Sequence, residues 1–223
     1  MDFEQLSTVY FGNVATSYVE RRTDAKWRSE NRALAQLLQY VPRGACSLDA
    51  PVGTGRSLAY TTAREFDAHG IDISADMLQQ ARTTAERLGA AIDLRQGDIR
   101  ALPFPDNRFD VVICLRFLNW IDGQGFGQVM RELTRVTRDK LLVGVRYLPP
   151  LDHLGGGGAD LLRRLMLRSG LSRYRATRRG LVSHPKALVH DMFAECGLKL
   201  YAMRMVERRW DGTEYAFFLL LKT

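Results

Sequence analysis

The chain has 223 residues, of which 46% are hydrophobic and 26% charged, and its formal net charge is +7. This length suits a single domain with a core of its own, and the apolar fraction excludes a disordered chain. No apolar run approaches the roughly 18–20 residues that a membrane-spanning helix needs. Cys46, Cys114 and Cys196 are too far apart for a disulfide framework or a zinc spacing. The N-terminus, with Asp2 and Glu4, lacks the pattern of a secretory signal. We therefore predict a cytoplasmic protein without a metal site.

The excess of positive charge is local. Residues 161–190 contain no Asp or Glu, and they include Arg163, Arg164, Arg168, Arg173, Arg175, Arg178, Arg179 and Lys186. The rest of the chain is nearly neutral. A basic segment of this kind is typical of a site for nucleic acid, for anionic lipid or for a phosphorylated small molecule, and it is equally compatible with a solvated helix face.

Strand-like and helix-like patterns alternate along the first two thirds of the chain, which favours an α/β fold with a parallel sheet. Helices are expected at 25–40, 56–65, 75–89, 126–138 and 185–195, and strands at 45–50, 69–73, 91–95, 109–115 and 140–146. Two last strands, 199–208 and 213–222, are joined at Asp211-Gly212, a hairpin signal. We predict a Rossmann-like, doubly wound, mainly parallel sheet. It ends in an antiparallel β-hairpin and carries a helical Arg-rich insertion after the fifth strand.

A glycine-containing loop follows the first strand, in the run LDAPVGTGR at 48–56. Gly53 and Gly55 allow a tight turn and a close approach of the backbone to a ligand. Asp72 ends the next strand, where a carboxylate can accept hydrogen bonds from ribose hydroxyls. The dinucleotide fingerprint fails because its third glycine would fall on Leu58, and no Walker Gly-Lys-Ser/Thr is present. The pattern therefore favours an adenosine-containing cofactor other than NAD, FAD or a nucleoside triphosphate.

Four segments in order resemble the class I S-adenosylmethionine (SAM)-dependent methyltransferase family. They are LDAPVGTGR at 48–56, GIDISADMLQQAR at 70–82, GDIRALPFPDNRFDVVICLRFLNW at 97–120 and MRELTRVTRDKLLVGVRY at 130–147. The resemblance implies one methyltransferase domain over 1–223. Within it, 1–42 forms an N-terminal helical lid, 43–147 the SAM-binding core, 148–182 a substrate-side insertion, and 183–223 a C-terminal helix and hairpin.

The resemblance also implies which residues bind SAM, and it places them in four groups along the core. Asp49 and the loop backbone face the methionine end and the ribose, and Asp72 binds the ribose hydroxyls. The adenine lies beside the apolar side chains of Ile73 and Met77, and it contacts Asp98 and Ile99 after the third strand. The complete implied set is Asp49, Gly53, Thr54, Gly55, Asp72, Ile73, Met77, Asp98, Ile99 and Leu115.

The acceptor site is predicted from the same resemblance and from charge. In similar enzymes an N-terminal segment covers the cofactor, and residues after the fourth and fifth strands meet the acceptor. The predicted acceptor-side residues are Tyr18, Arg22, Arg116, His153, Arg173, Arg175 and Arg178. Arginine binds phosphate and carboxylate well, which favours an anionic acceptor, either small or lipid-linked.

No catalytic base is assigned, because Asn119 and Trp120 stand where many relatives have histidine, and neither is a base at neutral pH. A carboxylate or phosphate acceptor is already ionised and needs none. Two alternatives stay open: an RNA methyltransferase whose arginines contact phosphates, and a SAM-binding regulatory protein without catalysis. The oligomeric state and the methylated atom are not predicted.

Overall fold

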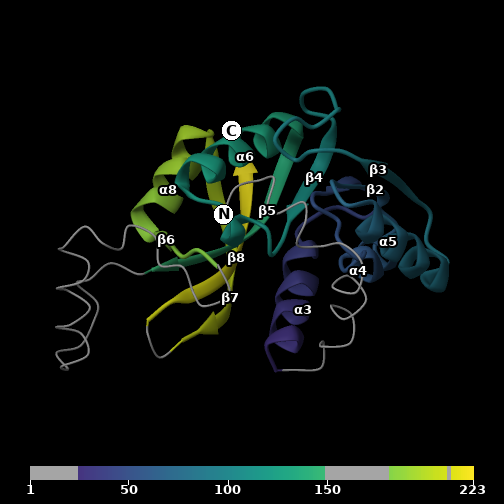
Figure 1. Ribbon diagram of the computed structural model, residues 1–223, viewed down its shortest axis with the longest axis horizontal. Coiled ribbons are helices and arrows are strands. Elements are labelled where there is room, and N and C mark those ends of the chain that lie inside the picture. Colours follow the sequence, from purple (N-terminus) through teal and green to yellow (C-terminus); the bar gives the residue numbers. More distant parts are fainter. Residues whose placement is uncertain (1–24, 149–180, 210–211) are drawn as a thin grey trace.

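An eight-stranded sheet organises the molecule (Figure 1). Seven strands follow the order β3-β2-β1-β4-β5-β8-β7, and the short β6 pairs with β5 outside this order. The strands are β1 (Cys46–Asp49), β2 (Asp67–Asp72), β3 (Ile92–Gln96), β4 (Phe109–Cys114), β5 (Thr137–Leu148), β6 (His184–Pro185), β7 (Leu198–Arg208) and β8 (Glu214–Lys222). The first five strands are parallel, and β8 and β7 are antiparallel to their neighbours. This computed structural model confirms a mainly parallel sheet that ends in an antiparallel hairpin.

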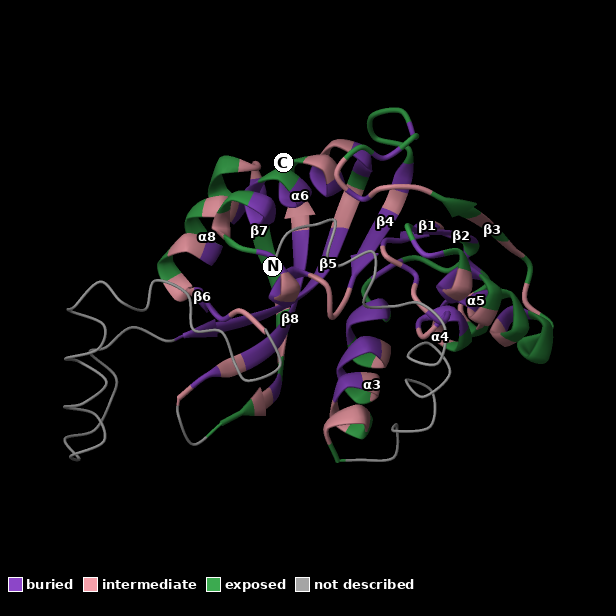
Figure 2. Cartoon of the chain, in the orientation of Figure 1, coloured by how far each residue is buried: buried purple, intermediate pink, exposed green. Residues whose placement is uncertain are grey.

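Helices cover both faces of the sheet. On one face, α3 (Ala25–Leu38), α4 (Leu58–Ala63) and α5 (Ala75–Leu88) follow one another, and on the other α6 (Gly123–Val136) contacts α8 (Lys186–Glu195). Leu34 of α3 packs in one core layer with Ile113 of β4, and Phe126 of α6 packs in the other layer with Val112. Because neighbouring residues of a strand point to opposite faces, the apolar run of β4 contributes to both layers. Figure 2 shows the resulting buried central strands.

Local signals position α5 behind the second strand. The hydroxyl oxygen of Ser74 accepts a hydrogen bond from the backbone N–H of Met77 at 3.3 Å, as an N-cap does. Gly89 ends the helix in the left-handed conformation, with φ of +61°. Both ends were predictable, and together they fix the turn that follows Asp72.

Three short features differ from the expected elements. The helix expected at 56–65 spans only Leu58–Ala63, because Gly55 turns the chain beforehand and Glu65 adopts a φ of +59°. A 3₁₀ turn, η1 (Leu118–Trp120), follows β4. The two-residue strand β6 pairs with the end of β5, a long-range contact that leaves no local pattern in the sequence.

The structure describes residues 25–148, 181–209 and 212–223. Predictions that concern Tyr18, Arg22, His153 and the arginines at 173, 175 and 178 lie outside these residues, as do most of the expected segments 1–42 and 148–182. Within the described ranges, no helix is both long enough and apolar enough to cross a membrane.

Candidate functional site

A pocket open to solvent lies at the carboxyl ends of β1, β2 and β4. In open α/β sheets ligands bind at this end of the strands, so the position agrees with the topology. The residues that line it are Asp49, Pro51, Val52, Gly53, Thr54, Arg56, Ser57, Asp72, Ile73, Ser74, Met77, Leu115, Arg116, Phe117 and Trp120.

The two glycines of the loop, Gly53 and Gly55, have different structural roles. Gly53 has a φ of +54°, and a Cβ added there would meet no atom within 4 Å, so its backbone faces open space on the ligand side. Gly55 has a φ of +77°, and an added Cβ would lie 2.7 Å from Cδ1 of Leu58 and 3.3 Å from Cα of Ala81. Gly55 is thus required for packing of the loop on α4 and α5, and it does not line the pocket.

The Asp72 carboxylate is held in a fixed orientation before any ligand arrives. One oxygen accepts from the backbone N–H of Gly53 and the other from the N–H of Ser74, both at 2.9 Å. Each carboxylate oxygen has a second lone pair, so both can still accept from a ligand hydroxyl. Burial raises the pKa of Asp72, and the backbone N–H donors oppose that shift. The arrangement fits a ribose with two adjacent hydroxyls.

Asp49 is the second carboxyl group of the pocket. Its side chain accepts a hydrogen bond from the Ser57 hydroxyl. Burial and the charge of Asp72 raise the pKa of Asp49 to about 7, although the Ser57 hydrogen bond opposes the shift. A cation bound beside Asp49 would favour its ionised form. This half of the pocket therefore suits a positively charged group.

Apolar side chains line the pocket beside Asp72. Ile73 is 42% exposed although it is apolar, and Met77 is almost fully buried against the same space. An aromatic ring that covers Ile73 would remove this surface from water, which stabilises a complex by about 25 cal/mol per Å² of apolar area. The combination of Asp72 with Ile73 and Met77 fits an adenosine.

On the opposite side, three charged side chains meet at the pocket wall. Glu30 of α3 is fully buried, and its Oε2 accepts from Nη1 of Arg56 and, at 3.5 Å, from Nη1 of Arg116. Arg56 also donates to Oδ1 of Asn31 at 3.0 Å and stacks 4.0 Å from the ring centre of Trp27. Arg116, predicted on the acceptor side, does line the pocket. Arg56 and Glu30 were missed by sequence reasoning, since nothing in the pattern of α3 marks Glu30 as buried.

The segment after β4 completes this wall. Arg116 has a φ of +63°, an uncommon conformation for a residue other than glycine and one that is concentrated at functional sites. Leu115, Phe117 and Trp120 add apolar surface. Asn119 is buried and accepts from the backbone N–H of Arg146 at 2.7 Å, so its role is structural.

Two predicted adenine contacts are placed differently. Asp98 and Ile99 follow β3, yet neither is among the residues that line the pocket. Arg100 donates to both carboxylate oxygens of Asp98 from its side chain. Burial works against ionisation of Asp98, but these hydrogen bonds outweigh it and keep the pKa below its usual value. The adenine contacts of Asp98 and Ile99 stay predictions.

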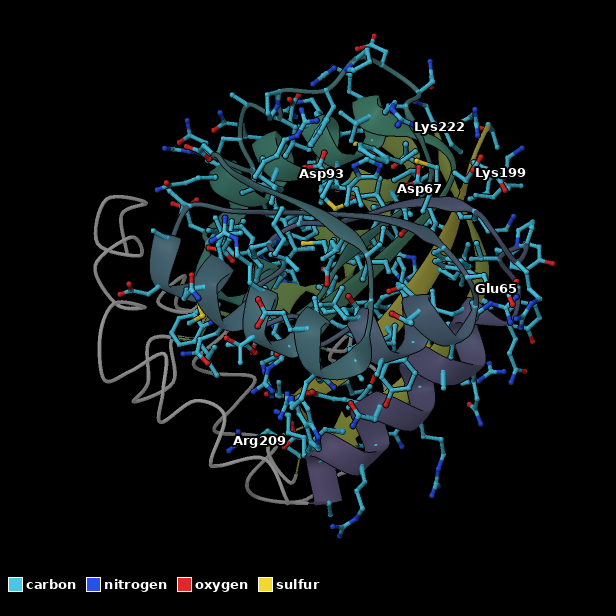
Figure 3. All side chains as sticks on the ribbon, turned by 90° about the vertical axis from the view of Figure 1, so that its right-hand side faces the viewer. Glu65, Asp67, Asp93, Lys199, Arg209 and Lys222 are labelled. Atoms are coloured by element: carbon cyan, nitrogen blue, oxygen red, sulfur yellow. The ribbon has the colours of Figure 1, made fainter. Side chains whose placement is uncertain are left out.

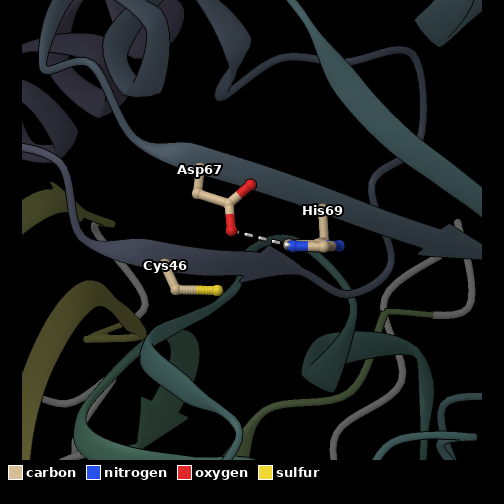
Figure 4. Close-up of side chains that lie close together, drawn as sticks. All are labelled: Cys46, Asp67 and His69. Carbon is tan, nitrogen blue, oxygen red and sulfur yellow. Dashed lines mark hydrogen bonds and ion pairs between the residues drawn. The ribbon is translucent and has the colours of Figure 1, made fainter.

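A separate cluster lies at the opposite ends of β1 and β2 (Figure 4). Cys46, Asp67 and His69 present ligand-type atoms within 4.8 Å of one another. His69 bridges Asp67 at 3.4 Å and Asp93 at 3.3 Å, and these two aspartates lie close together in Figure 3. Nη1 of Arg108 lies 3.0 Å from Sγ of Cys46, so a guanidinium opposes a metal cation beside the sulfur. We assign no metal to this cluster. Cys46 lies far from Asp67 and His69 in the sequence, and the fold brings the three side chains together.

Comparison with known proteins agrees with this site. A family model described as a methyltransferase domain matches residues 48–140, the stretch that holds the glycine loop, Asp72 and the wall after β4. Over this stretch the chain resembles the class I SAM-dependent methyltransferase family. The predicted fold class is confirmed, and the likeness supports the predictions of a methyltransferase and of SAM as its cofactor.

Curated relatives match the same stretch, and a solved structure shares the fold. The chain is 33% identical over 126 residues to a demethylmenaquinone methyltransferase of Bacillus licheniformis, which covers 55% of this chain and 51% of the relative. It is 38% identical over 98 residues to a phosphatidylethanolamine N-methyltransferase of Cereibacter sphaeroides, covering 43% and 47%. The chain thus spans about half the length of these curated relatives. The crystal structure of magnesium protoporphyrin IX methyltransferase from Synechocystis PCC 6803 with bound SAH superposes with a TM-score of 0.74 at 15% identity over 100% of both chains.

Proposed function

We propose that this methyltransferase transfers a methyl group from SAM to a small or lipid-linked acceptor that carries an anionic group, by in-line displacement. The observation that supports it most directly is the pocket itself. A preoriented Asp72 and the apolar Ile73 and Met77 suit an adenosine, while Asp49 suits the cationic methionine end. Two curated relatives are named for lipid-linked acceptors, demethylmenaquinone and phosphatidylethanolamine, which supports an acceptor of that type.

When bound, SAM would supply a methyl group on a positively charged sulfur: the acceptor would form a bond to the methyl carbon while the carbon–sulfur bond breaks, its electron pair goes to sulfur and S-adenosylhomocysteine (SAH) leaves. The protein aligns the nucleophile and excludes water, effects that contribute several kcal/mol. Leu115, Phe117 and Trp120 provide the apolar wall for this step. Among the described residues that line the pocket, the ionisable groups are two carboxyls and two arginines, and the carboxyls face the cofactor half. These described residues fit an acceptor atom that attacks without a dedicated base, such as an oxyanion.

The test is methyl transfer from radiolabelled SAM to three offered acceptors: a quinone-type lipid extract, phosphatidylethanolamine vesicles and total RNA. Label in a lipid or small-molecule fraction, lost in Asp72→Ala, supports the proposal. Label in RNA alone would favour the nucleic-acid alternative. SAM binding without transfer to any fraction would favour a regulatory protein.

The basic segment gives a second variant for the same assay. Charge reversal at Arg173, Arg175 and Arg178 is expected to abolish acceptor turnover and to leave SAH affinity unchanged, if these arginines hold the acceptor or its lipid surface. Unchanged turnover would remove the segment from the acceptor site.

A further inference from the structure

A buried cationic cluster lies directly behind the pocket wall, and we propose that it binds the anionic oxygen group, carboxylate or phosphate, of the acceptor. It consists of Arg146 on β5, Tyr215 on β8, Glu207 on β7 and Lys26 on α3, here called the Arg146 cluster. This inference rests on the proposed function and names the site that selects the acceptor.

The guanidinium of Arg146 has hydrogen-bonding capacity that the protein does not use. Arg146 is only 2% exposed, and its Nη2 donates to Oε2 of Glu207 at 3.1 Å. Its Nε and Nη1 atoms are buried and have no hydrogen-bond partner. Buried charged donors are otherwise almost always paired, because an unpaired one loses its hydration without compensation. The unpartnered donors of this buried arginine can therefore hydrogen-bond an anion.

The charge of the cluster points the same way. Glu207 also pairs with Nζ of Lys26 at 2.9 Å, so one carboxylate faces two cations and a positive charge remains in excess. Lys26 and Arg146 both approach the ring of Tyr215, at 5.3 Å and 5.4 Å from its centroid. The ring and the two cations form a compact surface that favours an anion over a cation or a neutral group.

The cluster is next to the transfer site, and a glycine makes this possible. A Cβ added to Gly144 would lie 2.8 Å from the hydroxyl of Tyr215 and 3.2 Å from Cδ2 of Leu115. The hydroxyl end of Tyr215 therefore occupies the space of an absent side chain, against the same Leu115 that lines the pocket. Leu115 thus borders both the pocket and the space beside the Tyr215 hydroxyl.

The backbone of Arg146 is held in place, and one edge of its cluster faces solvent. The backbone N–H of Arg146 donates to Asn119 of η1, which ties the end of β5 to the wall after β4. The side chains of Lys26 and Glu207 are 31% and 27% exposed, so the edge of the cluster that they form faces solvent. An acceptor anchored there by its anionic end can present its other end to the pocket.

The experiment measures anion binding by isothermal titration calorimetry on the full chain saturated with SAH, with inorganic phosphate and acetate as separate probes. Wild type is expected to bind one of the two, and which one identifies the anionic group. Arg146→Lys keeps the charge but loses Nε and Nη1, and it is expected to weaken that binding at least tenfold. The matched control is Arg204→Gln, which changes a half-buried arginine of β7 that pairs with Gln36, and it is expected to bind as wild type does.

The outcomes separate this inference from the proposed function. Failure of wild type to bind SAH contradicts the proposed function, whereas SAH binding with equal anion affinity in wild type and Arg146→Lys overturns only the inference. Loss of anion binding in the variant with Arg173, Arg175 and Arg178 changed to glutamine, but not in Arg146→Lys, also overturns it. Should Arg146→Lys not fold, Lys26→Gln removes a cation at a partly exposed position. It is expected to weaken anion binding at least threefold, and an unchanged affinity would overturn the inference.

Discussion

The buried pair of Glu30 and Arg56 gives the strongest prediction on stability. The Glu30 side chain is fully buried and that of Arg56 is 10% exposed, so neither charge is well hydrated. Removing one partner of such a pair costs about 3–5 kcal/mol, because the other charge stays buried without compensation. In the variant Glu30→Gln, Arg56 can still donate to Asn31 and to the neutral amide oxygen of the glutamine. We therefore expect a cost at the lower end of this range, about 3 kcal/mol.

The assay is urea unfolding of the ligand-free protein, with Glu65→Gln as the matched control. Glu65 pairs with Arg43 by the same chemistry, but these side chains are 70% and 56% exposed, and exposed pairs contribute about 0–1 kcal/mol. For a domain of this size, 3 kcal/mol corresponds to a fall in Tm of roughly 6–12 °C. A loss below about 1 kcal/mol in Glu30→Gln, equal to the control, would refute the burial argument.

Three further predictions concern the loop and the titrating groups. Gly55→Ala should lower the free energy of unfolding by about 2 kcal/mol more than Gly53→Ala, because only its Cβ would clash with Leu58; equal losses in denaturant titrations would contradict this. Burial raises the pKa of Asp49 to about 7, so the folded state holds a proton that the unfolded state has released. This group makes stability fall as the pH rises from about 4 to 7, and Asp49→Asn should flatten that part of the profile measured without ligand. Burial lowers the pKa of His184, so the free energy of unfolding should fall as the pH drops below about 6.5. If His184→Gln loses stability with acid just as wild type does, protonation of His184 is not the cause.

The order of the elements could be predicted from local signals, because each one is written in adjacent residues. The N-cap Ser74, the stop at Gly89 and the apolar run of β4 all lie where the periodicity places them. The strand β6 could not be found, since its pairing of His184 with Tyr147 depends on contacts between distant residues.

The site was predictable in part for the same reason. Asp49, Gly53 and Asp72 stand at strand ends, where the rule for ligand positions in parallel sheets applies. Glu30 and Arg146 have no such marker, because their burial depends on how α3, β7 and β8 pack around them. The Arg-rich segment can be recognised from its local charge, whereas the burial of a single arginine cannot be recognised from composition.

The claim that this pocket binds SAM through Asp72 is tested most directly by calorimetry with SAM and SAH. Wild type is expected to bind both, Asp72→Ala to bind at least tenfold more weakly, and Asp93→Ala, an exposed carboxylate of β3, to bind as wild type does. A tenfold change corresponds to about 1.4 kcal/mol, the scale of a hydrogen bond to a charged group. Absence of binding by wild type, or equal affinity in Asp72→Ala, would contradict the account.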